Sequence, residues 1–198
     1  MRFINQRITE YCISLIDMQI AVENVFTGAE EVIFITEHPG IYTAGKSFEQ
    51  SDFLNKSSDF RIYYPNRGGR ITIHSPGQIV IYPIINLKER RIGVIDYVRE
   101  LENWIIRILD AFAVHSFKIS DEIGIWTSAG KIGFIGVRIE KGISSHGFCI
   151  NINNELRSFE NILPCGLINA KITSLSEILG REIQTQDLSE IIIKHCPF

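Results

Sequence analysis

The stretch Asn66-Arg-Gly-Gly-Arg-Ile-Thr-Ile-His-Ser-Pro-Gly-Gln78 leads from a pair of glycines into strand-like sequence. Gly68-Gly69 can adopt backbone angles closed to other residues and lets a ligand approach the main chain. Apolar and polar residues alternate over 71–74, which predicts a short strand with a polar face that includes His74. The Pro-Gly pair then predicts a turn into a second strand over 79–84. Two interpretations follow: the floor of a binding site, or a β-hairpin without chemistry.

Size and composition indicate a soluble globular protein with one domain over residues 1–198. Hydrophobic residues make up 45% of the chain and charged residues 22%, and this length is typical of a single domain. The net charge of −3 argues against nucleic-acid or membrane partners. The N-terminus lacks an apolar signal-peptide core, and no run of 18 apolar residues occurs. Four cysteines without a secretory signal favour free thiols and a cytoplasmic location.

The hydrophobic pattern predicts helices at both ends and in the middle of the chain, with most strands in neighbouring pairs between them. The first helix is predicted from apolar residues at helical spacing, including Ile13, Ile16 and Ile20. Residues 47–60 are polar and irregular, which indicates a surface loop or a short helix. The expected helices cover 9–26, 94–112, 174–180 and 187–195, and the expected strands 32–36, 71–74, 79–84, 117–119, 125–127, 131–139 and 146–152. This order predicts an α+β fold: a mixed, largely antiparallel sheet with helices packed beside it.

Residues 40–47 match the P-loop pattern G-x-x-x-x-G-K-S. A P-loop requires its lysine and serine to open a helix whose N-terminus holds phosphate. The following residues, 48–52, are weak helix formers, and bulky Ile41 and Tyr42 occupy the loop. The pattern therefore does not favour a nucleotide site.

A metal site built from His146, Cys149 and Cys165 is a competing interpretation. Residues three apart on a strand point to opposite faces, which argues against a shared ion for the first two. The second cysteine pair typical of zinc sites is also missing. Neither a metal nor another cofactor is expected.

Two further residues carry reactive groups. Cys165 lies between a proline and a glycine, where a thiol can be exposed and a nearby backbone amide free. Lys131 precedes an apolar strand with two glycines, which weaken a strand unless another group must come close. Taken singly, each has an ordinary interpretation, an unreactive loop cysteine and a solvated lysine. Cys12 and Cys196 are expected to be inert, and Cys149 to act as a small buried hydrophobe.

Short motifs follow one another in order over residues 37–175. They are Glu37-His38-Pro39, Tyr42-Thr43, Gly45, Ser47, Arg67-Gly68-Gly69, Thr72, His74, Pro76-Gly77-Gln78, Tyr82-Pro83, Lys131-Ile132, Ile135-Gly136, His146-Gly147-Phe148, Asn151, Pro164-Cys165-Gly166 and Thr173-Ser174-Leu175. As a set they resemble the lipoyl(octanoyl) transferase family.

The resemblance implies transfer of an octanoyl chain from acyl carrier protein to a lysine of lipoate-dependent enzymes. The acceptors would be lipoyl domains of 2-oxoacid dehydrogenases or the glycine cleavage H protein. It also implies the fold of biotin and lipoate protein ligases, a monomer, and Cys165 with Lys131 as the catalytic pair. The implied acyl-binding residues are Arg67, Gly68, Gly69, Arg70, Ile71, Thr72, Ile73, His74, Phe134, Ile135, Gly136, Gly147, Phe148 and Cys149. Phe134 and Cys149 replace residues that are usually small in the family. Of the properties that the resemblance implies, these two replacements affect the preferred length of the acyl chain most.

The implied chemistry agrees with the residue types. A thiol is mostly protonated at neutral pH, and a nearby ammonium favours the thiolate. Lys131 would therefore activate Cys165 and later assist deprotonation of the acceptor amine. Conversion of a thioester to an amide runs downhill, so no ATP is required. The alternatives are an ATP-dependent lipoate or biotin ligase on the same fold, and an acyl- or partner-binding module without activity.

Overall fold

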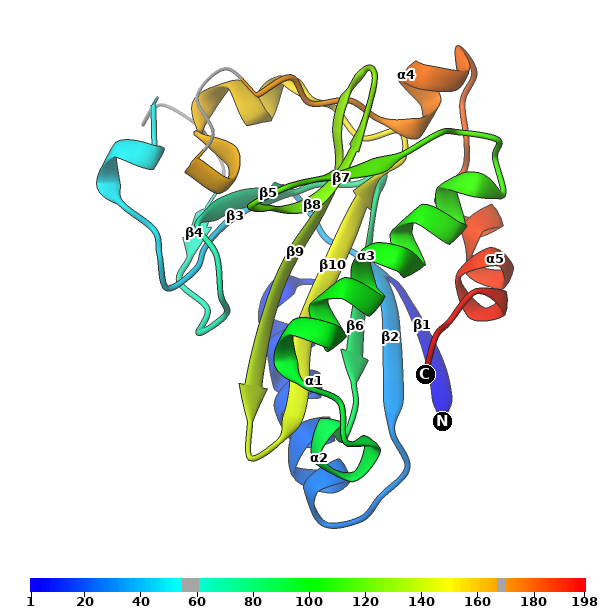
Figure 1. The fold of residues 1–198 in the computed structure, drawn as a ribbon. Coiled ribbons are helices and arrows are strands. Elements are labelled where there is room, and N and C mark those ends of the chain that lie inside the picture. The colour runs from blue at the N-terminus through cyan, green and yellow to red at the C-terminus, as the bar shows by residue number, and fades with distance from the viewer. Residues whose placement is uncertain (55–60, 167–169) are drawn as a thin grey trace.

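A twisted sheet of seven strands runs through the protein, with helices on both faces (Figure 1). The computed structural model describes residues 1–54, 61–166 and 170–198. In spatial order the strands are β1 (Arg2–Ile8), β2 (Val32–Glu37), β6 (Gln78–Ile84), β10 (Ile143–Asn151), β9 (Gly130–Glu140), β8 (Glu122–Thr127) and β7 (Phe117–Ile119). β1 and β2 are parallel, and the other neighbouring pairs are antiparallel. The predicted mixed, largely antiparallel sheet is confirmed.

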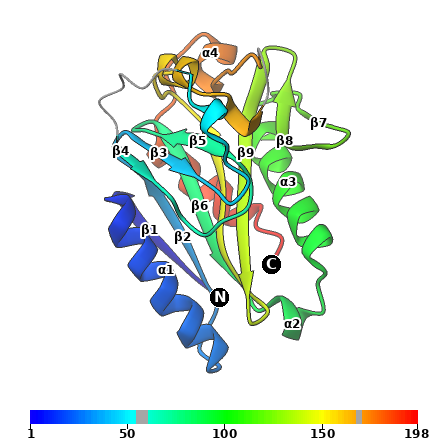
Figure 2. The same cartoon turned by 90° about the vertical axis from the view of Figure 1, so that its left-hand side faces the viewer.

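Helices α1 (Tyr11–Phe26) and α3 (Val94–Asp110) cover opposite faces of this sheet (Figure 2). Alternate side chains of β6 pack on opposite faces of the sheet, because successive side chains of a strand point in opposite directions. Ile79 and Ile81 pack in the core under α3. Val80 and Tyr82 pack in the core on the α1 side. Two separate hydrophobic cores therefore flank the sheet.

The predicted first helix is present, but only some of its apolar residues pack on the sheet. Ile13, Ile16 and Ile20 are 48%, 55% and 55% exposed. The buried side consists of Tyr11, Ser14, Met18, Ala21, Val22 and Val25. Both sides of the helix are largely apolar, so spacing alone did not identify the face that packs on the sheet.

A second, smaller sheet lies over one end of the large one. It contains β4 (Arg61–Tyr63), β3 (Ile41–Ala44) and β5 (Ile71–His74), in that spatial order. β3 pairs parallel with β4 and antiparallel with β5. The hairpin interpretation of residues 71–84 is wrong, because β5 belongs to the small sheet and β6 to the large one. The Ser-Pro-Gly turn carries the chain from one layer to the other.

The P-loop pattern lies on a strand and its exit, and not before a helix. β3 occupies four of its positions, and the next helical segment is the 3₁₀ turn Gln50–Asp52. The helix N-terminus that would hold phosphate is therefore missing from residues 41–54, which the structure describes in full. Of the irregular segment expected over 47–60, residues 55–60 lie outside the described part.

The C-terminal part begins with two 3₁₀ turns, Arg157–Asn161 and Pro164–Gly166, and continues with α4 (Leu175–Leu179), a 3₁₀ turn (Thr185–Leu188) and α5 (Ser189–Lys194). Ser174 caps the N-terminus of α4. The Ser174 hydroxyl accepts a hydrogen bond from the Glu177 amide at 3.2 Å. The Glu177 carboxylate accepts from the Thr173 hydroxyl at 2.8 Å instead of from the Ser174 amide. No helix in the described part of the chain is long and apolar enough to cross a membrane.

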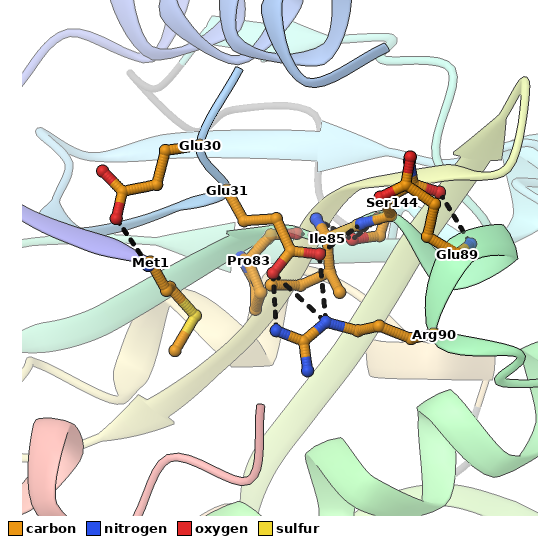
Figure 3. A network of polar contacts seen from close by, with 9 residues as sticks. Met1, Glu30, Glu31, Pro83, Ile85, Glu89, Arg90 and Ser144 are labelled. Atoms are coloured by element: carbon orange, nitrogen blue, oxygen red, sulfur yellow. Dashed lines mark hydrogen bonds and ion pairs between the residues drawn. The ribbon is translucent and has the colours of Figure 1, made fainter. Parts of the chain in front are cut away.

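A polar network closes the end of the large sheet that is remote from the small one (Figure 3). The carboxylate of Glu31 accepts from the Arg90 guanidinium at 2.6 Å and from the Asn86 amide at 2.8 Å. Arg90 ends the short helix α2 (Leu87–Arg90). On β10 the Ser144 hydroxyl donates to the Pro83 carbonyl at 2.7 Å and accepts from the Ile85 amide at 2.9 Å. These bonds fix the α2 connection to the edge of the sheet.

Trp104 provides a test of the core under α3. Its side chain is fully buried, its indole donates to the Ile192 carbonyl at 3.0 Å, and its ring packs edge-on against Phe148 at 5.2 Å. We expect Trp104→Ala to lower the free energy of unfolding by about 3–5 kcal/mol, measured by urea denaturation. Ile95→Ala, at a 70% exposed position of the same helix, should change it by less than about 0.5 kcal/mol. Equal losses in the two variants would contradict this packing.

Candidate active site

The two sheets enclose a small cavity, called here the inner cavity. It has a volume of about 40 Å³. Strand β5 forms one wall, and β6, β9 and β10 form the other. The lining residues are Tyr11, Arg67, Gly69, Arg70, Ile71, Thr72, His74, Val80, Tyr82, Phe134, Ile135, Gly136, His146, Gly147, Phe148, Cys149 and Cys165.

Most of the sequence-predicted acyl-binding residues meet in this cavity. Gly68 and Ile73 are the exceptions: Gly68 lines an adjoining groove, and Ile73 is fully buried in the core on the α1 side. Sequence reasoning missed Tyr11, which reaches the cavity from α1. No local signal marks Tyr11, because its place depends on how the helix docks across the sheet.

A buried arginine lies in the cavity wall. Arg67 is 6% exposed, and its guanidinium donates to the carbonyl and hydroxyl of Thr43 at 2.6 and 2.8 Å and to the Gly68 carbonyl at 2.8 Å. Among the described residues no carboxylate forms an ion pair with it. A methyl group at Gly136 would stand 3.1 Å from this side chain, so the glycine allows Arg67 to lie against β9.

A chain of buried hydrogen bonds runs from the cavity toward Lys131. Nδ1 of His74 lies 2.7 Å from Oε1 of Gln78, whose amide nitrogen donates to Oδ1 of Asn151 at 2.9 Å. Asn151 in turn donates to the Thr173 carbonyl at 3.0 Å. The Thr173 amide donates to the Lys131 carbonyl at 3.0 Å. Because the Gln78 oxygen is an acceptor here, His74 carries its proton on Nδ1 and presents Nε2 as an acceptor.

Three histidines beside the cavity are held neutral. Burial lowers the pKa of His74 to about 3 and of His38 to about 4. Burial and the charge of Arg67 lower the pKa of His146 to about 3. His38 bridges the Thr9 carbonyl and the Tyr82 hydroxyl at 2.7 and 2.8 Å. At neutral pH these rings supply hydrogen-bonding groups without charge.

Phe134 and Cys149 face each other across β9 and β10, where they are partners in the strand register. The Phe134 ring stacks on Phe159 with centroids 5.4 Å apart. Burial raises the pKa of the Cys149 thiol well above its ordinary value. This cysteine is therefore a protonated wall residue, as expected of a small buried hydrophobe.

The expectation that His146 and Cys149 face opposite sides of the sheet is wrong, since both line the inner cavity. His146 has a φ of 55°, and this left-handed conformation breaks the alternation of side chains along β10. Within the described ranges, no group of three His, Cys, Asp or Glu side chains is placed to hold a metal ion.

Lys131 is not the solvated lysine of the ordinary interpretation. It lies on β9 and is 1% exposed. Its Nζ donates to the Ile123 carbonyl at 2.9 Å and lies 5.2 and 5.6 Å from the ring centroids of Trp126 and Phe134. No hydrogen bond joins Nζ to Sγ of Cys165, both of which are in the described part. The ammonium is held by one carbonyl and two aromatic faces.

Cys165 occupies a tight turn and is half-buried. Its φ of 58° and ψ of 19° place the backbone in the left-handed region. The Gly166 amide donates to the Leu163 carbonyl at 2.9 Å, so the expectation of a free amide is wrong for Gly166. The side chain of Arg70 lies against Gly166 and is fixed by Asp52, which it contacts at 2.7 and 2.9 Å.

A groove of about 330 Å³, called here the outer groove, adjoins the inner cavity. Both are lined by Gly69, Arg70, Ile135, Gly136 and Cys165. The outer groove also includes Lys131, which the inner cavity does not. Cys165 therefore stands at the junction of the two spaces, and Lys131 lines only the outer one.

Comparison with known proteins gives the family. Residues 13–197 match the model of the lipoyl protein ligase A/B catalytic domain. The chain belongs to this family. It is 40% identical over 193 residues to the octanoyltransferase of Rickettsia canadensis (strain McKiel), covering 93% of this chain and 91% of that protein. It is 38% identical over 200 residues to the octanoyltransferase of Rickettsia prowazekii (strain Madrid E), covering 96% and 95%.

Solved structures of two protein ligases share the fold. Lipoate-protein ligase A bound with ATP superposes with a TM-score of 0.73 at 11% identity, over 98% of this chain and 83% of that one. The biotin protein ligase of Aquifex aeolicus gives a TM-score of 0.55 at 12% identity, over 99% and 67%. The predicted resemblance to lipoyl(octanoyl) transferases and to the ligase fold is confirmed.

The buried histidines of this family member predict a pH-dependent stability. Their folded pKa values lie below the ordinary value of ~6.5, so between pH 6.5 and about 4 the unfolded chain binds more protons. Stability is therefore lost as the pH falls through this window, by at most ~1.4 kcal/mol per pH unit for each histidine. Urea denaturation at pH 7.5 and 5.5 measures the slope. His38→Gln should reduce the slope and His115→Gln, at an exposed position, should not; pH-independent stability contradicts the assignment.

Proposed function

We propose that this chain acts as an octanoyltransferase through a covalent intermediate on Cys165, with Lys131 as its proton-transfer partner. It is an acyltransferase of protein lipoylation, as its octanoyltransferase relatives indicate. One observation carries the residue assignment: Cys165 stands between a buried cavity and a groove that contains Lys131. The octanoyl chain would extend from its thioester at Cys165 into the inner cavity, whose volume of about 40 Å³ must widen to hold eight carbons. The whole chain, residues 1–198, would form the single catalytic domain.

In the first half-reaction the Cys165 thiolate attacks the donor thioester. A bond forms between Sγ and the acyl carbon, and the bond from that carbon to the donor sulfur breaks. The Lys131 ammonium gives a proton to the departing thiolate, which leaves as a thiol. Lys131 is then neutral and the acyl chain is held on the enzyme.

In the second half-reaction an acceptor lysine arrives as an ammonium ion. It gives one proton to neutral Lys131 and attacks the Cys165 thioester as a free amine. The carbon–nitrogen bond forms, the carbon–sulfur bond breaks, and the second proton of the nitrogen passes to solvent. Cys165 returns to the thiolate and Lys131 to the ammonium, so the cycle closes without ATP.

The partners follow from the same reaction. The relatives imply an acyl donor and a lipoyl-domain acceptor in general terms. We assign octanoyl-acyl carrier protein as the donor and a lipoyl domain or glycine cleavage H protein as the acceptor. A thiol nucleophile needs a reducing compartment, and the four cysteines are free, which supports a cytoplasmic location.

Incubation with octanoyl-acyl carrier protein should add one octanoyl group to Cys165. Mass spectrometry of the intact protein detects the adduct, and hydroxylamine should remove it because it is a thioester. Cys165→Ala should form no adduct, whereas Cys149→Ala should still form one. An adduct on Cys165→Ala, or full turnover by this variant, contradicts the covalent mechanism. Turnover that needs free octanoate and ATP would identify a ligase instead.

Lys131 should be required for turnover because it moves protons in both halves of the reaction. Lys131→Met removes the charge, and Lys131→Arg keeps a charge that does not release its proton. We expect both variants to lose at least about 100-fold in kcat/KM, in the range typical of general acid–base groups. Lys46→Met, at an exposed position, is the control. Near-normal turnover by Lys131→Arg would remove the proton-transfer role.

A further inference from the structure

Glu122 is a carboxylate without a partner beside the proposed active site. It is the first residue of β8 and half-buried, and its Oε2 atom is shielded from solvent with no hydrogen-bond partner among the described residues. Among the described residues its side chain forms no hydrogen bond and no ion pair. A buried, unpaired carboxylate oxygen is costly to maintain. This side chain is therefore placed to receive a group from outside.

The cations near Glu122 are engaged elsewhere. Lys118, on the paired strand β7, contacts Glu102 of α3 at 3.5 Å and Asn103 at 2.8 Å. Arg70, across the outer groove, is paired with Asp52 and Glu49. Lys131 donates to the Ile123 carbonyl. None of these three cations forms an ion pair with Glu122.

Glu122 opens on the space where the second half-reaction would take place. It lines the outer groove together with Lys131 and Cys165, and it does not line the inner cavity. The adjacent residue, Ile123, supplies the carbonyl that holds Lys131. The carboxylate is thus on the side from which a nucleophile approaches, and not on the side of the acyl chain.

The chemistry of the acceptor matches this placement. The acceptor lysine arrives as an ammonium ion, and in the proposed cycle Lys131 is neutral at that point. A carboxylate in the groove binds the incoming cation through a charge-assisted hydrogen bond. The acyl donor carries no positive charge at its thioester and gains nothing from this group.

We propose that Glu122 binds the ε-ammonium of the acceptor lysine in the outer groove and orients its nitrogen toward the Cys165 thioester. This role rests on the proposed function. It assigns Glu122 to the second half-reaction alone. Loss of the carboxylate should therefore affect a cationic nucleophile and spare a neutral one.

The test uses the full-length protein with octanoyl-Cys165 already formed. Glu122→Gln keeps the shape and removes the charge. Glu190→Gln is the matched control: Glu190 is exposed and lines neither the inner cavity nor the outer groove, and the exchange removes the same charge. Single-turnover rates are measured with a lipoyl-domain acceptor, and with hydroxylamine as a neutral nucleophile.

We expect Glu122→Gln to raise the acceptor concentration for half-maximal rate about tenfold, the loss typical of a hydrogen bond to a charged group. Its hydroxylamine rate and its rate of octanoylation by the donor should stay within twofold of wild type. Glu190→Gln should match wild type throughout. Wild-type transfer to the lysine by Glu122→Gln, or an equal loss with hydroxylamine, overturns the inference. Failure of the wild-type protein to form the Cys165 adduct would instead overturn the proposed function.

Discussion

The side-chain amide of Gln78 is the interaction on which the arrangement of the two sheets depends. Gln78 begins β6 in the large sheet, yet its oxygen faces His74 in the small sheet and its nitrogen bonds Asn151 on β10. All three groups are buried, so loss of the amide would leave two polar partners unsatisfied at a cost of about 1–3 kcal/mol each. The Ser-Pro-Gly turn brings β5 of the small sheet close to β6 of the large sheet, and the Gln78 amide fixes the separation of the two sheets. The inner cavity is the space that remains between them.

The electrostatics of the site divide at Cys165. On the inner side, two neutral histidines and two tyrosines line a space whose charge comes from Arg67 and Arg70. On the outer side, Lys131 and Glu122 place opposite charges in one groove. The inner cavity is suited to an acyl chain, because a chain that enters this small space displaces little water. The outer groove is suited to proton transfer with a charged amine, because its side chains can balance the charges that form during the reaction.

Local sequence patterns predicted the elements with strong periodicity, notably α3, β9 and β10. They missed the edge strand β1, whose polar residues give no alternation, and β3, which lies within the P-loop pattern. The same patterns predicted a hairpin over 71–84, because two strands joined by a short turn are expected to pair with each other. Ordered motifs singled out Cys165 and Lys131, although 34 positions separate them. Glu122 and Tyr11 carry no such signal, since their importance arises from contacts between distant segments.

Strand β9 contributes residues to both spaces within one short run. Lys131 faces the outer groove, Phe134 faces the inner cavity, and Ile135 and Gly136 line both. Because side chains alternate along a strand, a one-residue insertion or deletion within this run would move every one of them to the opposite face. The number of residues between Lys131 and Phe134 therefore decides which of the two spaces each side chain enters. A substitution at Phe134 alters the wall of the inner cavity without moving Lys131.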